Sequence, residues 1–169
     1  PKKLEPHNNV TVRIKDISNA RLHSELPRTP LWTYGGSLPG PTIEVRKGHV
    51  LTAHWKNNVH SGSMLPVVVV ETPYDDATAD PVPQNGPGSN GRPVVMGTDT
   101  LPAYTVVHLH GGRTQADSDG WPDSVHARGT VQTDVYDNDQ RARMLWYHDH
   151  AMAVTRLNVY AGLAGMYVI

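Results

Sequence analysis

The sequence contains no cysteine and no phenylalanine. The lack of cysteine excludes disulfides, thiolate zinc sites, iron–sulfur clusters and a complete blue-copper site, because each of these needs a cysteine sulfur. The lack of phenylalanine means that Trp, Tyr, Val and Leu must fill the core. No apolar run approaches the roughly 18 residues of a membrane-spanning helix, so we expect no membrane partner.

An excess of charge of one sign is also missing. The 15 Lys and Arg residues against 16 Asp and Glu residues give a net charge of −1. Proteins that bind nucleic acid or membrane surfaces through charge carry a basic excess, so neither partner is expected. The length of 169 residues suits one folded domain. Residues 1–5 do not resemble a signal peptide, which favours a cytoplasmic location, although nothing else in the sequence defines the compartment.

The apolar pattern predicts a protein built mainly of β-strands. Residues 10–15 alternate between apolar and polar, as in a half-buried strand. Residues 72–104 are rich in Pro, Gly, Asp and Asn and are interpreted as a loop insertion. One short helix is expected at 155–161, ended by Gly162. Short strands separated by turns predict an all-β fold, a Greek-key β-sandwich or barrel. Further strands are expected at 31–34, 43–45, 51–55, 67–70, 105–110, 144–148 and 165–169.

Histidine is the residue type that indicates chemistry here. Four of the 10 histidines form two His-x-His pairs, His108 with His110 and His148 with His150. Residues two apart on a strand face the same side, roughly 6.6 Å apart, so a pair can bind one metal or two adjacent metals. Four imidazoles without thiolate or carboxylate suit Cu, Zn, Fe or Ni, and copper binds most tightly. The others are interpreted as surface or hydrogen-bonded residues: His7, His23, His49, His54, His60 and His126.

Local sequence around these pairs resembles the first cupredoxin domain of the multicopper oxidases. Within that family it is most similar to the bacterial group of spore-coat laccases, bilirubin oxidases and phenoxazinone synthase, with phenoxazinone synthase, the o-aminophenol oxidase, closest. The resemblance implies a cupredoxin-like fold in which residues 1–169 form the first of three domains, with domains two and three outside this chain. The segments that carry the resemblance are 31–43, 108–111, 117–122, 146–150 and 148–163.

The same resemblance implies a copper-dependent oxidase. A phenolic or o-aminophenol substrate would give electrons to a type 1 copper in the third domain, and a trinuclear cluster between domains one and three would reduce O₂ to water. His108 would bind the type 2 copper, His110 and His148 one type 3 copper, and His150 the other. Coupling of oxidised o-aminophenols would form phenoxazinones, a reaction of antibiotic biosynthesis. Because this chain holds half of the cluster ligands, it is expected to be inactive alone; a homo-oligomer is compatible with the sequence.

Two aspartates beside the histidine pairs carry separate predictions. Asp119 matches a family carboxylate near the type 2 copper, which implies a catalytic role in delivering protons to reduced oxygen. The alternative is that Asp119 only forms the turn at 118–120. Asp149 alternates with the two ligands of its pair, so on a strand it points away from the metal and supports the ligands from behind.

Two other functions stay open. The first is a non-catalytic cupredoxin module that holds or passes copper. The second is a binuclear-metal hydrolase, since paired histidines also occur in such enzymes. Those hydrolases usually add a carboxylate ligand, and many are barrels with long helices between strands. The present sequence has no such periodic helices. Copper content and oxygen uptake of the full-length protein separate the three functions.

Overall fold

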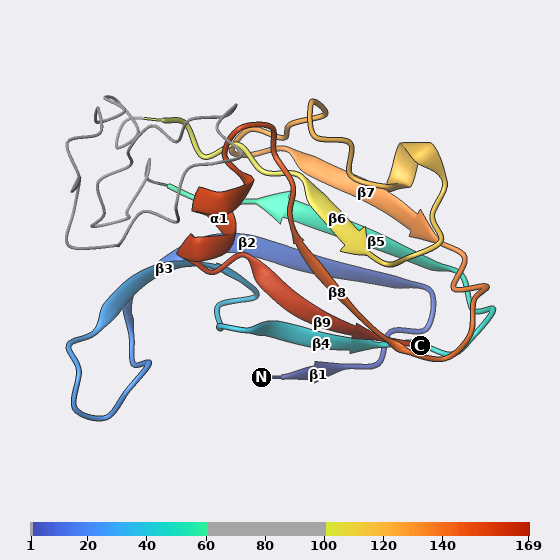
Figure 1. Cartoon of the computed structure of the whole chain (residues 1–169), viewed down its shortest axis with the longest axis horizontal. Coiled ribbons are helices and arrows are strands. Elements are labelled where there is room, and N and C mark those ends of the chain that lie inside the picture. Colours follow the sequence, from blue (N-terminus) through green and yellow to red (C-terminus); the bar gives the residue numbers. More distant parts are fainter. Residues whose placement is uncertain (1, 61–100) are drawn as a thin grey trace, which may run out of the picture.

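The computed structural model describes residues 2–60 and 101–169. Within these ranges the chain forms two β-sheets and one short α-helix, which lies at one end of the strands (Figure 1). The expected strand at 67–70 and the expected loop insertion, except for its last four residues, lie outside the described ranges. In the part of the chain that is described, no helix is long and apolar enough to cross a membrane.

The first sheet, sheet A, has five strands in the order β1-β4-β9-β8-β6. Strands β6, β8 and β9 are antiparallel neighbours, whereas β4 runs parallel to both β9 and β1. Strands far apart in sequence therefore lie side by side. The bounds are β1 (Lys3–Leu4), β4 (Gly40–Glu44), β6 (Val107–His110), β8 (Met144–Asp149) and β9 (Ala164–Val168).

The second sheet, sheet B, has four strands in the order β3-β2-β5-β7. Strand β2 pairs antiparallel with β3 and parallel with β5, and β7 is antiparallel to β5. The predicted all-β sandwich is confirmed, in the form of two mixed sheets. The bounds are β2 (Asn9–Ala20), β3 (Thr29–Tyr34), β5 (Leu51–Asn57) and β7 (Val131–Tyr136).

Aromatic side chains from both sheets fill the core, as the lack of phenylalanine predicts. Tyr34, Trp55 and Tyr147 are buried and lie with ring centroids 5.0 to 5.6 Å apart. Aromatic pairs at such distances add stability beyond the area they bury. The Tyr147 hydroxyl donates a hydrogen bond of 2.6 Å to the carbonyl of Pro41, which satisfies its polar end inside the core. Tyr147 immediately precedes His148, so this packing fixes the strand that carries the second histidine pair.

The one α-helix among residues 2–60 and 101–169, α1 (Thr155–Ala161), has the predicted bounds and ends at Gly162. Gly162 has a φ of +123°, and a Cβ added there would lie 2.5 Å from the carbonyl oxygen of Trp32. Only glycine can meet both conditions, so it lets the chain turn back against β3 and enter β9. Strands β1 and β7 and the 3₁₀ helix η2 (Ala116–Ser118) are not predicted by the sequence pattern.

Candidate metal centre

The two histidine pairs meet on the outward face of sheet A. Strands β6 and β8 pair so that His108 lies directly opposite His148. His110 lies two residues after His108 and therefore shares its face. His150 follows the last residue of β8, and its ring centroid lies 5.0 Å from that of His108 and 5.8 Å from that of His148. The structure thus brings together all four histidines that the sequence singles out.

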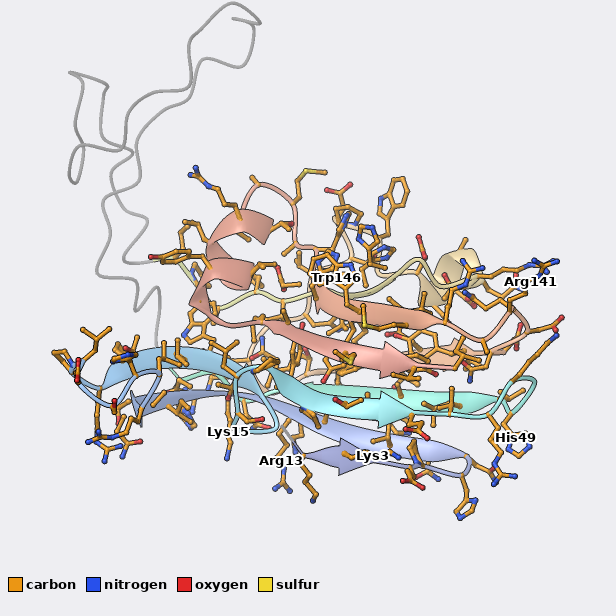
Figure 2. The ribbon with its side chains drawn as sticks, turned by 60° about the horizontal axis from the view of Figure 1, so that its bottom comes forward. Lys3, Arg13, Lys15, His49, Arg141 and Trp146 are labelled. Atoms are coloured by element: carbon orange, nitrogen blue, oxygen red, sulfur yellow. The ribbon has the colours of Figure 1, made fainter. Side chains whose placement is uncertain are left out.

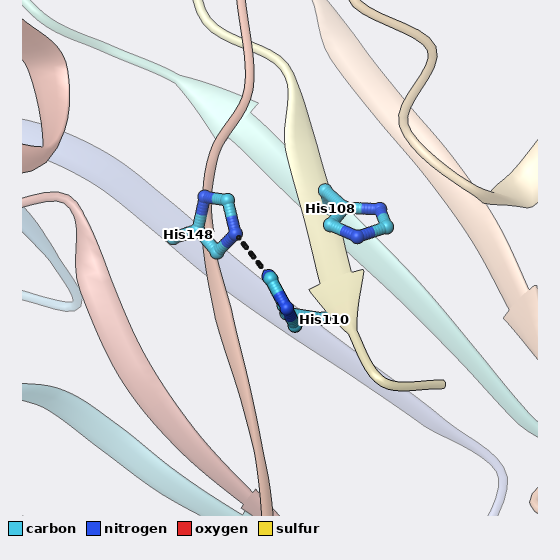
Figure 3. Close-up of side chains that lie close together, drawn as sticks. All are labelled: His108, His110 and His148. Atoms are coloured by element: carbon cyan, nitrogen blue, oxygen red, sulfur yellow. Dashed lines mark hydrogen bonds between the residues drawn. The ribbon is translucent and has the colours of Figure 1, made fainter. Parts of the chain in front are cut away.

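Three of these histidines form a group with metal-binding geometry. The ligand atoms of His108, His110 and His148 all lie within 4.8 Å of one another. Nδ1 of His110 and Nε2 of His148 are 3.1 Å apart and face each other (Figure 3). Two nitrogens that bind one metal at about 2.0–2.1 Å each lie roughly 3–4 Å apart. The spacing of His110 and His148 therefore fits one shared ion.

Backbone carbonyl groups fix the orientation of two of the rings. Nδ1 of His148 lies 2.7 Å from the carbonyl oxygen of Asp149, and Nδ1 of His108 hydrogen-bonds to the carbonyl oxygen of Asp119. A carbonyl can only accept, so in both rings Nδ1 must carry the proton. Nε2 is then unprotonated and free to bind a metal, which is the arrangement found behind metal-ligating histidines.

The electrostatics of the site favour neutral imidazole, the form that binds metal ions. Burial lowers the pKa of His148, and positive charge on His108 or His110 would lower it further. Burial also lowers the pKa of His150, again with a contribution from the neighbouring imidazoles. Nδ1 of His150 is buried and has no hydrogen-bond partner among residues 2–60 and 101–169. Burial therefore favours the neutral, metal-binding form of His148 and His150.

Asp119 lies beside His108, on the loop that follows η2. Its carboxylate is 3.6 Å from Nδ1 of His108, is 43% exposed, and accepts a hydrogen bond from the Thr114 hydroxyl. The loop approaches β6 so closely that a Cβ on Gly120 would lie 2.1 Å from the carbonyl oxygen of Val107. Gly120 has a φ of +75° and allows this contact. The structure places Asp119 at the histidine cluster, and its role in proton delivery stays a prediction.

Asp149 points away from the cluster, as predicted, and is fully buried. Its carboxylate accepts hydrogen bonds from the backbone N–H groups of Val106 (3.0 Å) and Ala151 (3.1 Å) and from the side chain of Asn158 (2.9 Å). Burial raises the pKa of Asp149 to about 7. Asn158, on α1, also donates to the carbonyl of Tyr104. No local sequence signal indicates the role of Asn158, because this role depends on contacts with residues distant in sequence.

The remaining histidines do not join the cluster. His54 pairs with the Thr133 hydroxyl at 3.0 Å, and His60 pairs with Asp16 at 3.0 Å. Across residues 2–60 and 101–169 the only group of three or more metal-ligating side chains is the one on sheet A. The described part of the chain is therefore a β-sandwich with a histidine group on one sheet face that could hold a metal ion.

Comparison with known proteins specifies the family. The family model described as multicopper oxidase matches residues 17–85 and 88–169. The chain is 42% identical over 157 residues to a laccase of Bacillus subtilis (strain 168), a match that covers 88% of this chain and 27% of the relative. It is 44% identical over 157 residues to a laccase of Bacillus stratosphericus, covering 88% of this chain and 26% of the relative. The chain belongs to the multicopper oxidase family.

Solved structures agree with this assignment. A multicopper oxidase from Campylobacter jejuni, described as a metallo-oxidase, superposes with a TM-score of 0.62 at 25% identity, covering 95% of this chain and 25% of that chain. A multi-copper oxidase from Pediococcus acidilactici superposes with a TM-score of 0.68 at 20% identity, covering 100% of this chain and 28% of that one, and supports the fold. The chain spans about a quarter of the length of the curated relatives it matches. The multicopper oxidase family binds copper, and the group of His108, His110 and His148 could hold such a metal ion.

Proposed function

We propose that this chain is the first cupredoxin domain of a three-domain oxidase and supplies half of the ligands of a trinuclear copper cluster. His108 binds the type 2 copper, His110 and His148 share one type 3 copper, and His150 binds the other. The observation that carries this proposal is the 3.1 Å separation of the facing nitrogens of His110 and His148. The free Nε2 atoms of His108 and His148 support it.

Copper, when bound, supplies the redox chemistry: electrons taken from a reducing substrate pass to O₂, and four electrons and four protons convert it to two waters. The residues of this chain hold and orient the site. The carbonyl groups of Asp119 and Asp149 set the tautomers of His108 and His148. The Asp119 carboxylate, which is partly exposed to solvent, delivers protons from water to the cluster side.

The substrates follow from the family group rather than from this chain. We infer that the full enzyme oxidises phenolic or o-aminophenol compounds, with phenoxazinone formation by oxidative coupling as the specific version of this reaction. The remaining copper ligands come from a later part of the polypeptide. Exposed apolar residues on the histidine-bearing face support such a covering partner: Met144, Trp146 and Met166 are all 40% or more exposed.

The test uses the full-length protein loaded with copper. Changing His108 to Ala should deplete the type 2 copper, whose paramagnetic resonance signal then disappears. Changing His110 to Ala should disrupt the type 3 pair, which is silent while its coppers are coupled and visible once they are not. His54 to Ala is the matched control, because it is also a strand histidine that faces outward.

Each result has a distinct meaning. Loss of copper in both cluster variants but not in the control supports the proposal. Full copper in His110 to Ala contradicts it. Copper binding without oxygen uptake in the wild-type protein would favour the non-catalytic copper module instead. Hydrolysis with zinc but no oxygen uptake with copper would favour the hydrolase.

A further inference from the structure

Trp146 lies in the middle of the histidine-bearing face. On β8 it is directly opposite His110 of β6 on one side and Met166 of β9 on the other. It precedes His148 by two residues and therefore points to the same face of the sheet. The side chain is 40% exposed. Figure 2 shows it on the side of the molecule away from Arg13 and Lys15.

The indole of Trp146 contacts both histidines of the 3.1 Å pair. Its ring centroid lies 5.2 Å from that of His110, with the planes 27° apart, and 4.1 Å from that of His148, with the planes 31° apart. The two imidazoles therefore lie along one aromatic surface. A single flat side chain can set the relative position of both rings, since stacked rings resist tilting and sliding.

His110 needs such support because it lacks the anchor of its neighbours. In His108 and His148 the Nδ1 atoms are held by backbone carbonyls, which leaves Nε2 to bind a metal. In His110 it is Nδ1 that faces His148, so Nδ1 cannot also be anchored. Among the described residues, no carbonyl or carboxylate hydrogen-bonds to the His110 ring. The stacked indole takes the place of that hydrogen bond.

We propose that Trp146 is a positioning residue: its indole holds His110 and His148 in the geometry that lets them share one copper ion. The proposal rests on the assignment of this pair to one copper. A metal-bound imidazole carries more positive charge than a free one, and the face of an indole attracts positive charge. The stacking therefore strengthens when copper is bound, which stabilises the bound state.

The test compares three variants of the full-length, copper-loaded protein. Trp146→Ala removes the ring, Trp146→Phe keeps a smaller ring, and Met144→Ala is the control. Met144 lies on the same strand and the same face and is 67% exposed. Met144→Ala therefore removes a side chain from this face without removing an aromatic ring from the histidines. Copper release to a chelator and the paramagnetic resonance spectrum are measured for each, with the thermal midpoint of the metal-free protein.

We expect Trp146→Ala to release copper roughly 10- to 100-fold faster, the range for lost support behind a metal ligand. An uncoupled copper signal should appear in its spectrum. Trp146→Phe should release copper at a rate close to that of the wild type, and Met144→Ala should release it at the wild-type rate. The metal-free midpoint of Trp146→Ala should fall no further than that of the control, because the role is exerted on the ligands rather than on the sheet.

Two results would overturn the proposal. One is copper release from Trp146→Ala at the wild-type rate with an unchanged spectrum. The other is faster release matched equally by Met144→Ala, which would mean that any loss on this face loosens the site. His110→Ala separates this failure from failure of the copper assignment. If His110→Ala loses its copper while Trp146→Ala retains it, only the positioning role is wrong; if both retain it, the pair does not share a copper.

Discussion

The strands of both sheets alternate between buried and exposed residues, but the exposed residues on the outward faces of the two sheets differ in chemistry. On sheet A the outward row holds His110, Trp146 and Met166 side by side. On sheet B the corresponding rows hold threonines and cations, with Arg13 opposite Lys56. Because the inward side chains of both sheets form the core, the fold is compatible with either outward set. Function depends on which side chains are placed on the free face.

Histidine itself shows the difference between the faces. His54 of sheet B lies opposite Thr133, and its ring bonds to the threonine hydroxyl at 3.0 Å. On sheet A, Nδ1 of His148 bonds to a backbone carbonyl, and its Nε2 faces Nδ1 of His110 at 3.1 Å. His148 is therefore a candidate ligand because a neighbouring strand brings another imidazole to its Nε2, which does not happen at His54.

The sharpest test of this comparison replaces one histidine on each face. His148→Ala should lose the copper that His148 and His110 share, and oxygen consumption of the full-length enzyme should fall to background. His54→Ala should keep its copper and change the free energy of unfolding by no more than about 0.5 kcal/mol, as is usual for surface substitutions. Copper analysis, oxygen uptake and denaturant unfolding of the pair provide the measurement. Equal copper loss from both variants would contradict the claim that only the histidines on sheet A bind copper.

Asp119→Asn is expected to have the next largest effect. The substitution keeps the size of the side chain and an acceptor for the Thr114 hydroxyl, and it leaves the backbone carbonyl that orients His108 unchanged. Copper loading and stability should stay near normal, while turnover falls by roughly 10²- to 10⁴-fold, as for a lost acid–base group. If Asp119 only forms a turn, Asn is well tolerated and oxygen consumption stays unchanged.

The sequence predicts one part of this site well. Each His-x-His pair lies on or directly after an expected strand, at 105–110 and at 144–148, so the shared face within a pair is predicted from strand geometry. That the two pairs meet requires β6 to lie beside β8, which is a long-range pairing. The resemblance to the multicopper oxidases implies this meeting of the two pairs, whereas the local sequence does not. The ring contacts that Trp146 makes with both His110 and His148 depend on the same pairing, and no local pattern indicates them.

Strand β7 shows why part of the fold cannot be predicted from the local sequence. Its alternation is present, but the sense is reversed: the buried side chains are Gln132, Asp134 and Tyr136, and the exposed ones include Val131 and Val135. Strand prediction from alternation assumes that the buried residues are apolar, so it does not detect such a strand. Gln132 is buried because it hydrogen-bonds through both side-chain ends to the backbone of Val107. These partners lie on another strand and cannot be read from the local sequence.

Each sheet also contains one buried aspartate, and Asp149 is the more strongly anchored. Changing Asp149 to Ala would leave the donors of Val106, Ala151 and Asn158 without their acceptor. Unpaired buried donors cost about 1–3 kcal/mol each, so we expect a loss of about 3 kcal/mol or more in the free energy of unfolding. Urea unfolding compared with Thr133→Ala, on the other face, measures this. A loss below about 1 kcal/mol would contradict the anchoring role.

Asp134 of sheet B is expected to make stability depend on pH. It is buried, accepts hydrogen bonds from Gln132 and the Tyr136 hydroxyl, and burial raises its pKa from 3.8 to about 6, with the carboxylate of Asp117 adding to the rise. The folded state therefore holds this proton more tightly than the unfolded state. The contribution of the protonated Asp134 carboxyl to the free energy of unfolding is fully present below about pH 4. It is lost as the pH rises through about 6.

The matching variant is Asp134→Asn, which resembles the protonated carboxyl in shape. It should remove a fall of about 2–3 kcal/mol in stability between about pH 4 and pH 7, at 1.36 kcal/mol per pKa unit. Urea unfolding of both proteins at several pH values measures the difference, which should grow as the pH rises. A constant difference at all pH values would mean that Asp134 does not titrate in this range.

The smallest expected effect concerns the like-charged pair on the outward face of sheet B. Arg13 and Lys56 lie directly opposite on β2 and β5, and neither forms an ion pair with a described residue. Like charges in this position destabilise a sheet, whereas opposite charges contribute roughly 0.2–1 kcal/mol. Lys56→Glu should therefore raise the free energy of unfolding by about that amount. The gain should shrink at high salt, because exposed charges are screened.

Copper content and oxygen uptake should not change, since the substitution lies on the face without the proposed histidine ligands. Urea unfolding at low and high salt measures the gain, and a loss of copper in this variant would mean that the two faces are coupled.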